Sequence, residues 1–135
     1  MVKFILGEKG SGKTKEMIDL ANKLSLESKG SVVFVDKNRN HIYDLDKSIR
    51  LVETADFNID TTRSFYGFLC GVISQNFDID SIFIDGQKQI DEADETNTLD
   101  FINHLETLTN KFGVKFIVSA SKIGKNIPDS LKRYL

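Results

Sequence analysis

The stretch that most constrains the fold of this chain is residues 7–14, which read Gly-Glu-Lys-Gly-Ser-Gly-Lys-Thr. They fit the pattern G-x-x-x-x-G-K-[ST], and a strand-like apolar run at residues 2–6 comes directly before them. The segment after them places apolar residues at i, i+3, i+4 and i+7, which is one face of a helix. These residues are Met17, Leu20, Ala21 and Leu24. A strand, a glycine-rich loop and a helix in this order predict a loop that binds phosphate.

The chemistry of the loop explains its composition. Gly7 and Gly12 let the backbone bend through angles that other residues resist. The N–H groups of the loop then point inward, and the helix aims the positive end of its dipole at the same place. We expect Lys13 to reach the β- and γ-phosphates of a nucleotide and the Thr14 hydroxyl to bind Mg²⁺. The predicted phosphate-binding residues are Gly7, Glu8, Lys9, Gly10, Ser11, Gly12, Lys13 and Thr14. The alternative interpretation is a surface turn rich in glycine and lysine.

Two aspartates follow apolar runs and are candidates for the acid that a magnesium–nucleotide site needs near Thr14. Asp85 closes the run Ile-Phe-Ile at residues 82–84, and Asp36 closes the run Val-Val-Phe-Val at residues 32–35. We predict that Asp85 holds the metal, directly or through water. Asp36 takes that role under a different strand order, or else acts on an attacking water. An aspartate at the end of a strand is also common in ordinary turns. The candidate catalytic residues are therefore Lys13, Asp85 and Asp36.

Alternating strands and helices predict the architecture of the whole chain. Besides the first strand and helix, strands are expected near residues 31–36, 49–53, 80–85 and 114–119, and helices near 62–75, 98–111 and 129–134. This alternation indicates βαβ units, a mainly parallel sheet of about five strands and an α/β fold. The length of 135 residues is that of a single domain, residues 1–135.

The helix predicted at residues 62–75 carries three smaller expectations. Its apolar stripe contains Phe65, Phe68 and Leu69, and the two glycines Gly67 and Gly71 suggest close packing against a neighbour. The single cysteine, Cys70, is expected to be a buried structural thiol.

Composition excludes several classes of protein. The net charge of −2 leaves no electrostatic footprint for nucleic acid or an anionic membrane. No apolar run reaches 18 residues, so no transmembrane helix is expected. The strand at the start of the chain leaves no room for a signal peptide. One cysteine cannot form an intramolecular disulfide, which suits a cytoplasmic protein.

Residues 7–14 and 82–85 resemble the Walker A and Walker B elements of the P-loop NTPase superfamily. The chain is similar to its additional-strand branch, which holds RecA-like and thymidine-kinase-like proteins, and to small bacterial ATP-binding proteins. The resemblance implies a three-layer α/β/α fold that binds ATP or ADP with Mg²⁺. In this branch a later strand lies between the loop strand and the metal strand, and residues 114–119 are the candidate. No Asn-Lys-x-Asp motif predicts specificity for GTP.

One departure from this branch concerns the catalytic base. Most of its ATPases have a glutamate directly after the metal aspartate, whereas here Gly86 and Gln87 follow Asp85. Two alternatives remain. Gln87 could position a water, or Asp36 or Glu53 could replace the base.

The same resemblance bears on the serines at the end of the last strand and on the arginines. In related NTPases a polar residue at the end of the last strand senses the γ-phosphate, and Ser119 and Ser121 stand there. A solvated turn is the other interpretation. No arginine lies in a motif that would make it an arginine finger: Arg39, Arg50, Arg63 and Arg133.

Three functions fit these patterns. The first is an ATP-binding protein with slow or partner-dependent Mg-ATPase activity. The second is a small-molecule kinase with an acceptor pocket near Phe65, Tyr66 and Phe68. The third is a nucleotide-dependent binding or switch module without turnover, for which the acidic residues 91–95 could contact a partner. Such a charge run is usually a solvated face. A protein partner or a homodimer could complete the site, by analogy with other minimal domains.

Overall fold

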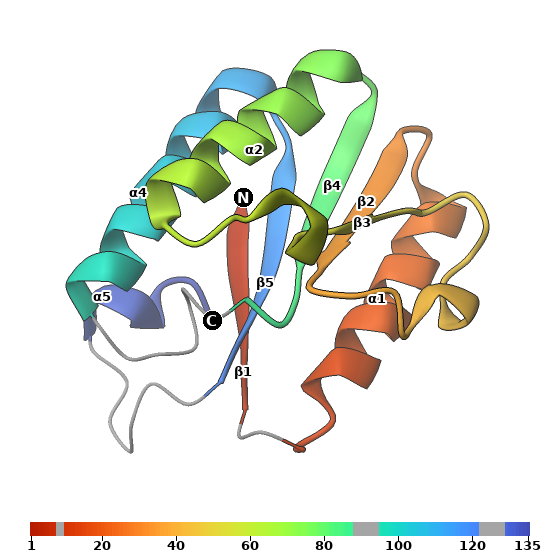
Figure 1. Ribbon diagram of the computed structural model, residues 1–135, viewed down its shortest axis with the longest axis horizontal. Coiled ribbons are helices and arrows are strands. Elements are labelled where there is room, and N and C mark those ends of the chain that lie inside the picture. Colours follow the sequence, from red (N-terminus) through yellow and green to blue (C-terminus); the bar gives the residue numbers. More distant parts are fainter. Residues whose placement is uncertain (8–9, 88–94, 122–128) are drawn as a thin grey trace.

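Five parallel strands form one sheet at the centre of the computed structural model, which describes residues 1–7, 10–87, 95–121 and 129–135 (Figure 1). The strand order is β1-β5-β4-β2-β3. Every neighbouring pair is parallel. In that order the strands are β1 Val2–Gly7, β5 Lys115–Ser121, β4 Ile79–Ile84, β2 Ser31–Asp36 and β3 Arg50–Glu53. The prediction that a late strand lies between the first strand and the strand before Asp85 is confirmed, and so is the parallel sheet of five strands.

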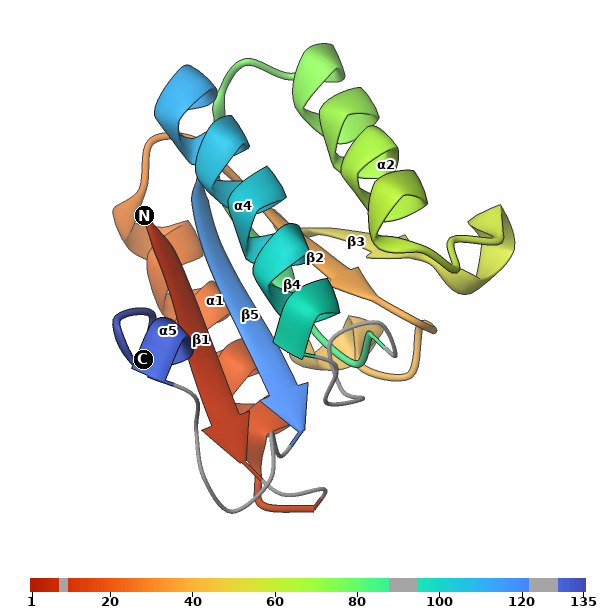
Figure 2. The ribbon, with the colours of Figure 1, turned by 90° about the vertical axis from the view of Figure 1, so that its left-hand side faces the viewer.

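Helices cover both faces of the sheet, which makes an α/β fold of three layers. Helix α1 packs on one face, while α2 and α4 pack side by side on the other (Figure 2). Their bounds are α1 Lys13–Glu27, α2 Thr62–Gln75 and α4 Glu95–Phe112, and a short α5 spans Asp129–Lys132. Two 3₁₀ turns, η1 Ile42–Asp44 and η2 Ala55–Phe57, flank β3 in the chain.

The apolar runs of the sequence explain why the central strands need two covering layers. In β2, Val33 and Val35 face the core under α2 and α4, whereas Val32 and Phe34 face the core under α1. All four side chains are buried. Phe34 also stacks on Phe83 of β4, with ring centroids 6.0 Å apart. A strand buried on both faces has no polar alternation, which is the pattern seen in the sequence.

Local interactions fix the ends of two helices and occupy one edge of the sheet. Thr61 caps α2: its hydroxyl accepts a hydrogen bond from the Ser64 N–H, and the Ser64 hydroxyl accepts one from the Thr61 N–H. Gly113 follows the last residue of α4 with a left-handed φ of 71°. At the β1 edge, the Phe4 N–H donates to the carbonyl of Tyr134 at 2.6 Å, which occupies a donor that would otherwise be open to another chain.

Two expectations about α2 are wrong. A Cβ atom built on Gly67 or Gly71 meets no heavy atom within 4 Å, so neither glycine marks a close helix contact. Cys70 is partly exposed and not fully buried. Gly71 instead borders a space between α2 and β3. Residues 91–94 of the acidic segment and Pro128 lie outside the described residues.

The cap of α2 gives a first testable prediction. Thr61→Ala should lower the free energy of unfolding by about 1 kcal/mol, because it removes the side chain that satisfies the Ser64 N–H. Urea unfolding followed by circular dichroism measures this change. Thr107→Ala, at an exposed position inside α4, is the control and should change stability by less than about 0.5 kcal/mol. Equal effects at both positions would contradict the role of the cap.

Candidate functional site

Parallel pairing brings the carboxyl ends of four strands to one edge of the sheet, where the predicted site residues lie. β1 runs into the glycine-rich loop and α1, and β4 ends next to Asp85. β2 ends at Asp36, and Ser119 lies in the last part of β5. The sequence predicted each of these elements separately. The strand order now places them next to one another.

The described part of the loop has the backbone shape expected for an anion site. Gly10 and Gly12 have φ angles of 85° and 91°, which side-chain-bearing residues rarely adopt. Gly7 does not have a positive φ, contrary to expectation; it provides space, because a Cβ there would collide with the Ser11 hydroxyl and touch the stem of Lys13. Gly12 occupies the N-cap of α1, so the open N–H groups of the first helical turn face the loop. Glu8 and Lys9 lie outside the described residues.

Asp85 joins the loop helix to the sheet. The Thr14 hydroxyl donates to Asp85 Oδ2 at 3.0 Å, across 71 residues of sequence. The Ser119 hydroxyl donates to the other carboxylate oxygen, Oδ1. Asp85 is only 4% exposed, so these two hydroxyls compensate for much of the water that its carboxylate lost. The predicted pairing of Thr14 with Asp85 is therefore present, and Ser119 acts on Asp85 at the end of β5.

Asp36 is also buried, with 4% exposure, but it has fewer partners. The Lys37 N–H donates to Asp36 Oδ1 at 2.7 Å, while Oδ2 is buried without a hydrogen-bond partner among the described residues. Burial raises the pKa of the Asp36 carboxyl. The hydrogen bond from Lys37 opposes this rise, and the nearby charge of Asp85 adds to it. The two predicted acids thus lie at one edge of the sheet in different environments. Asp85 accepts a hydrogen bond from Thr14, whereas Asp36 Oδ2 has no hydrogen-bond partner among the described residues.

A buried polar network that the sequence did not predict supports both acids. The Thr54 hydroxyl donates to Gln87 Oε1 at 3.2 Å, and Gln87 Nε2 donates to the main-chain oxygen of Asp85 at 3.0 Å. The Thr54 N–H donates to the main-chain oxygen of Asp36 at 2.8 Å. Gln87 is 3% exposed. Its amide therefore ties the turn after β4 to the end of β3, which leaves it poorly placed to orient a water.

The other base candidate, Glu53, is occupied as well. It ends β3 and forms an ion pair with Arg39, with a nitrogen–oxygen distance of 3.5 Å. The structure thus separates the three alternatives for a base: Gln87 and Glu53 are held by other groups, and Asp36 keeps one oxygen without a partner in the described chain.

Space for a ligand lies on the Thr14 side of α1. A cavity of about 430 Å³ is bordered there by residues of α1 and of the segment around η1, which are Thr14, Lys15, Ile18, Asp19, His41 and Asp44. Its lining residues include Lys15, Asp19 and Asp44, so charges of both signs border it. Phe65, Tyr66 and Phe68, near which a kinase pocket was expected, lie on α2, on the face of the sheet opposite α1.

The chain was compared with protein-family models and with curated proteins, and neither comparison found a match. The described residues contain no cluster of three histidine, cysteine or acidic side chains that could hold a metal ion. No helix in the described ranges is long and apolar enough to cross a membrane.

The environment of Asp36 generates a pH prediction. A raised carboxyl pKa means that the folded state prefers the neutral form, so the Asp36 charge costs stability above about pH 4 and costs nothing below it. Asp36→Asn, which carries no charge at any pH, should therefore unfold at higher urea than the parent protein at pH 7. This advantage should shrink as the pH falls toward 4.

The control for this experiment is Asp56→Asn, which removes a charge from an exposed position in η2. It should shift the urea midpoint little at either pH. An Asp36→Asn variant that is less stable than the parent at pH 7, with Asp56→Asn unchanged, would show that the charged form of Asp36 stabilises the fold.

Proposed function

We propose that the protein is a P-loop NTPase that binds ATP with Mg²⁺ and hydrolyses it slowly, or when a partner completes the site. The observation that carries the proposal is the hydrogen bond from Thr14 to Asp85. It joins the last residue of the G-x-x-x-x-G-K-[ST] pattern to the acid that resembles Walker B. A chance glycine-rich turn would have no reason to meet that acid.

The fold supports the proposal independently of the side chains. The order β1-β5-β4-β2-β3 has one strand between the loop strand and the strand before Asp85. This is the arrangement that the resemblance to RecA-like and thymidine-kinase-like proteins implies. The positive φ angles of Gly10 and Gly12 also suit a loop whose N–H groups surround a phosphate.

The donor set at this edge suits magnesium. Hydroxyl and carboxylate oxygens are the ligands that Mg²⁺ prefers, and Thr14 and Asp85 provide one of each. In the proposed complex Thr14 contacts the metal and Asp85 holds it directly or through water. Lys13 and the loop N–H groups contact the phosphates. When bound, the metal would neutralise negative charge that develops on the phosphate oxygens.

Asp36 is the best candidate for the base in the proposed reaction. It lies next to Asp85 at the sheet edge, and its Oδ2 accepts no hydrogen bond from the described residues. Its raised pKa moves the carboxyl toward the range in which a base both accepts and releases protons near neutral pH. Slow turnover follows from the absence of a glutamate directly after Asp85, where Gly86 stands.

A kinase is the second candidate, and the cavity beside Thr14 is the observation in its favour. A volume of about 430 Å³ holds a small acceptor molecule next to the proposed γ-phosphate. The residues that border this cavity do not include Asp36, so His41 and Asp44 are the groups that would contact the acceptor. Phosphate transfer to a metabolite, measured by mass spectrometry, distinguishes this function from hydrolysis.

Removing Lys13 tests nucleotide binding. Lys13→Ala should weaken Mg-ATP binding by at least about tenfold in calorimetric titration, because it deletes a charge-assisted contact to the phosphates. Lys15→Ala is the matched control: Lys15 is exposed in the same helix and pairs with Asp19 at 3.1 Å. Unchanged affinity in Lys13→Ala, or equal losses in both variants, would rule out the proposed role of the loop.

Replacing each acid in turn tests the proposed roles, Asp85 as the metal ligand and Asp36 as the base. Asp85→Asn should reduce the gain in ATP affinity that Mg²⁺ provides, while metal-free affinity stays nearly the same. Asp36→Asn should keep the magnesium effect and lower the rate of phosphate release. The opposite result, with the magnesium effect lost in Asp36→Asn, would reverse the two assignments.

A further inference from the structure

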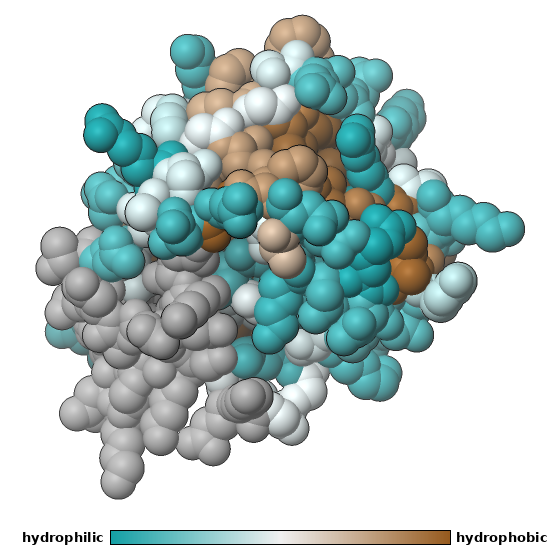
Figure 3. Space-filling view, viewed as in Figure 1, coloured by the Kyte–Doolittle hydropathy of each residue, from teal (hydrophilic) through white to brown (hydrophobic). Residues whose placement is uncertain are grey.

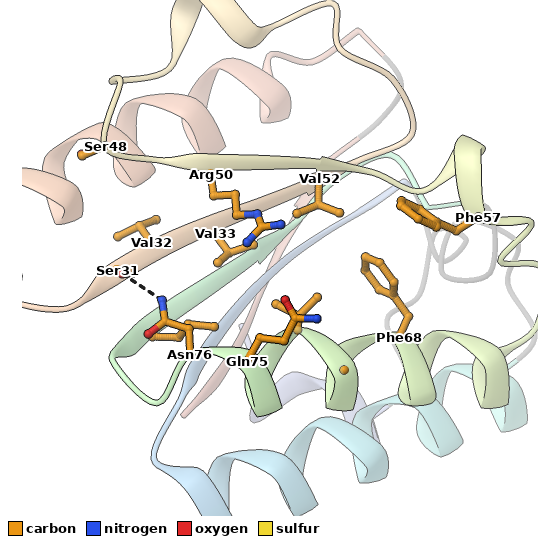
Figure 4. A pocket seen from close by; sticks show the side chains of 13 residues that line it. Ser31, Val32, Val33, Ser48, Arg50, Val52, Phe57, Phe68, Gln75 and Asn76 are labelled. Atoms are coloured by element: carbon orange, nitrogen blue, oxygen red, sulfur yellow. Dashed lines mark hydrogen bonds between the residues drawn. The ribbon is translucent and has the colours of Figure 1, made fainter.

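A second cavity, of about 440 Å³, opens between α2 and β3 on the face of the sheet opposite α1 (Figure 4). Its volume is that of a typical small-molecule site. Apolar side chains from three strands, α2 and η2 form most of its wall: Val33, Val52, Phe57, Phe68, Val72 and Ile79. The rings of Phe57 and Phe68 lie 5.9 Å apart and close one end. In Figure 3 a hydrophobic region is visible on the α2 side of the molecule, with polar side chains around it.

The cavity is open partly because α2 has no side chain at Gly71. Gly71 lines it, and a Cβ atom built there would meet only open space. The neighbouring strand β3 has only four residues and lies at the edge of the sheet. The second apolar stripe of α2, with Phe68 and Val72, therefore stays half-buried and faces the cavity.

One charge borders this apolar space, on a side chain that is exposed to solvent at the edge of the sheet. The side chain of Arg50 extends from β3 toward Val33 and Gln75 (Figure 4). No acidic residue lines the cavity within the described chain, and Arg50 forms no ion pair with any described residue. Arg39 and Arg133, in contrast, each pair with a glutamate. The lining near Arg50 thus offers a positive charge, and the amide of Gln75 lies across from it.

We propose that this cavity binds a small organic anion. Its apolar body lies among the valine and phenylalanine side chains, and its carboxylate or other anionic group pairs with Arg50. A guanidinium beside apolar walls favours such a ligand because its charge can pair with the anionic group while the walls contact the apolar body. A neutral apolar ligand would gain nothing from this charge.

This site is separate from the proposed nucleotide site. The cavity extends from the first residues of β2 and β4 and the last turn of α2 to Phe57 in η2, and no residue of the glycine-rich loop lines it. The glycine-rich loop and Asp85 lie at the other ends of the strands. Binding here does not depend on nucleotide binding, so Lys13→Ala should retain it whether or not the protein is an NTPase.

The test is an NMR titration of the ¹⁵N-labelled full chain with 4-phenylbutyrate and with decanoate, each to 10 mM. Amide signals of cavity residues in α2 and β3 should shift. In Arg50→Met, which keeps an apolar stem without the charge, affinity for 4-phenylbutyrate should fall about threefold to fivefold, because an ion pair that water reaches is weak. Affinity for neutral 4-phenylbutanol should stay the same. Arg63→Met, at an exposed position on α2, controls for net charge and should change neither affinity.

A second pair of variants tests the location without removing any polar group. Gly71→Leu fills the cavity and should abolish the shifts. Gly67→Leu also meets open space on α2 but does not line the cavity, so binding should persist. Both variants replace an exposed helical glycine, so any gain in helix stability is matched.

Three results would overturn the proposal: no shifts with either probe, shifts that Gly71→Leu leaves intact, or equal affinity of 4-phenylbutyrate for the parent and Arg50→Met. Light scattering adds a fourth. A dimer of the parent protein that Gly71→Leu dissociates would mean that a second copy, and not a small anion, occupies this groove.

Discussion

Parallel pairing of the five strands is the constraint on which the candidate site depends. Ile84 pairs with Val118, so the next residues along β4 and β5, Asp85 and Ser119, become neighbours. Val35 pairs with Ile84 in the same way, which brings Asp36 to the same edge. A shift of one residue in either pairing would turn these side chains to the opposite face. The apolar residues that fill the two cores therefore also fix the positions of the polar residues beyond them.

Burying two carboxyl groups at one edge costs free energy, and the protein compensates for the two costs unequally. Asp85 receives hydrogen bonds from two hydroxyls, whereas Asp36 receives one from a backbone N–H and keeps a buried oxygen without a partner in the described chain. Buried polar atoms without partners are rare in folded proteins. Local rules are most often broken at sites that bind or react. This asymmetry is the physical reason to assign different roles to the two acids.

Features that depend on nearby residues were predictable from the sequence, and features that depend on the distance between elements were not. Continuous apolar runs predicted β2 and β4, and the three-to-four spacing of apolar residues predicted α1. The Thr54–Gln87 hydrogen bond joins segments 33 residues apart, and neither residue belongs to a pattern. Gly71 shows the same limit: a helical glycine either permits close approach or leaves space, and only the position of β3 decides between the two.

β3 links the two regions of interest through its alternation. Arg50 and Val52 point toward the cavity under α2, while Leu51 packs toward α1. Two residues beyond Val52, Thr54 donates hydrogen bonds to Gln87 and to the main chain of Asp36. An edge strand of four residues has one hydrogen-bonded neighbour, so it opens at a lower free energy than the central strands. The same short strand therefore supplies lining residues to the cavity and leads directly into the hydrogen bonds that support the two acids.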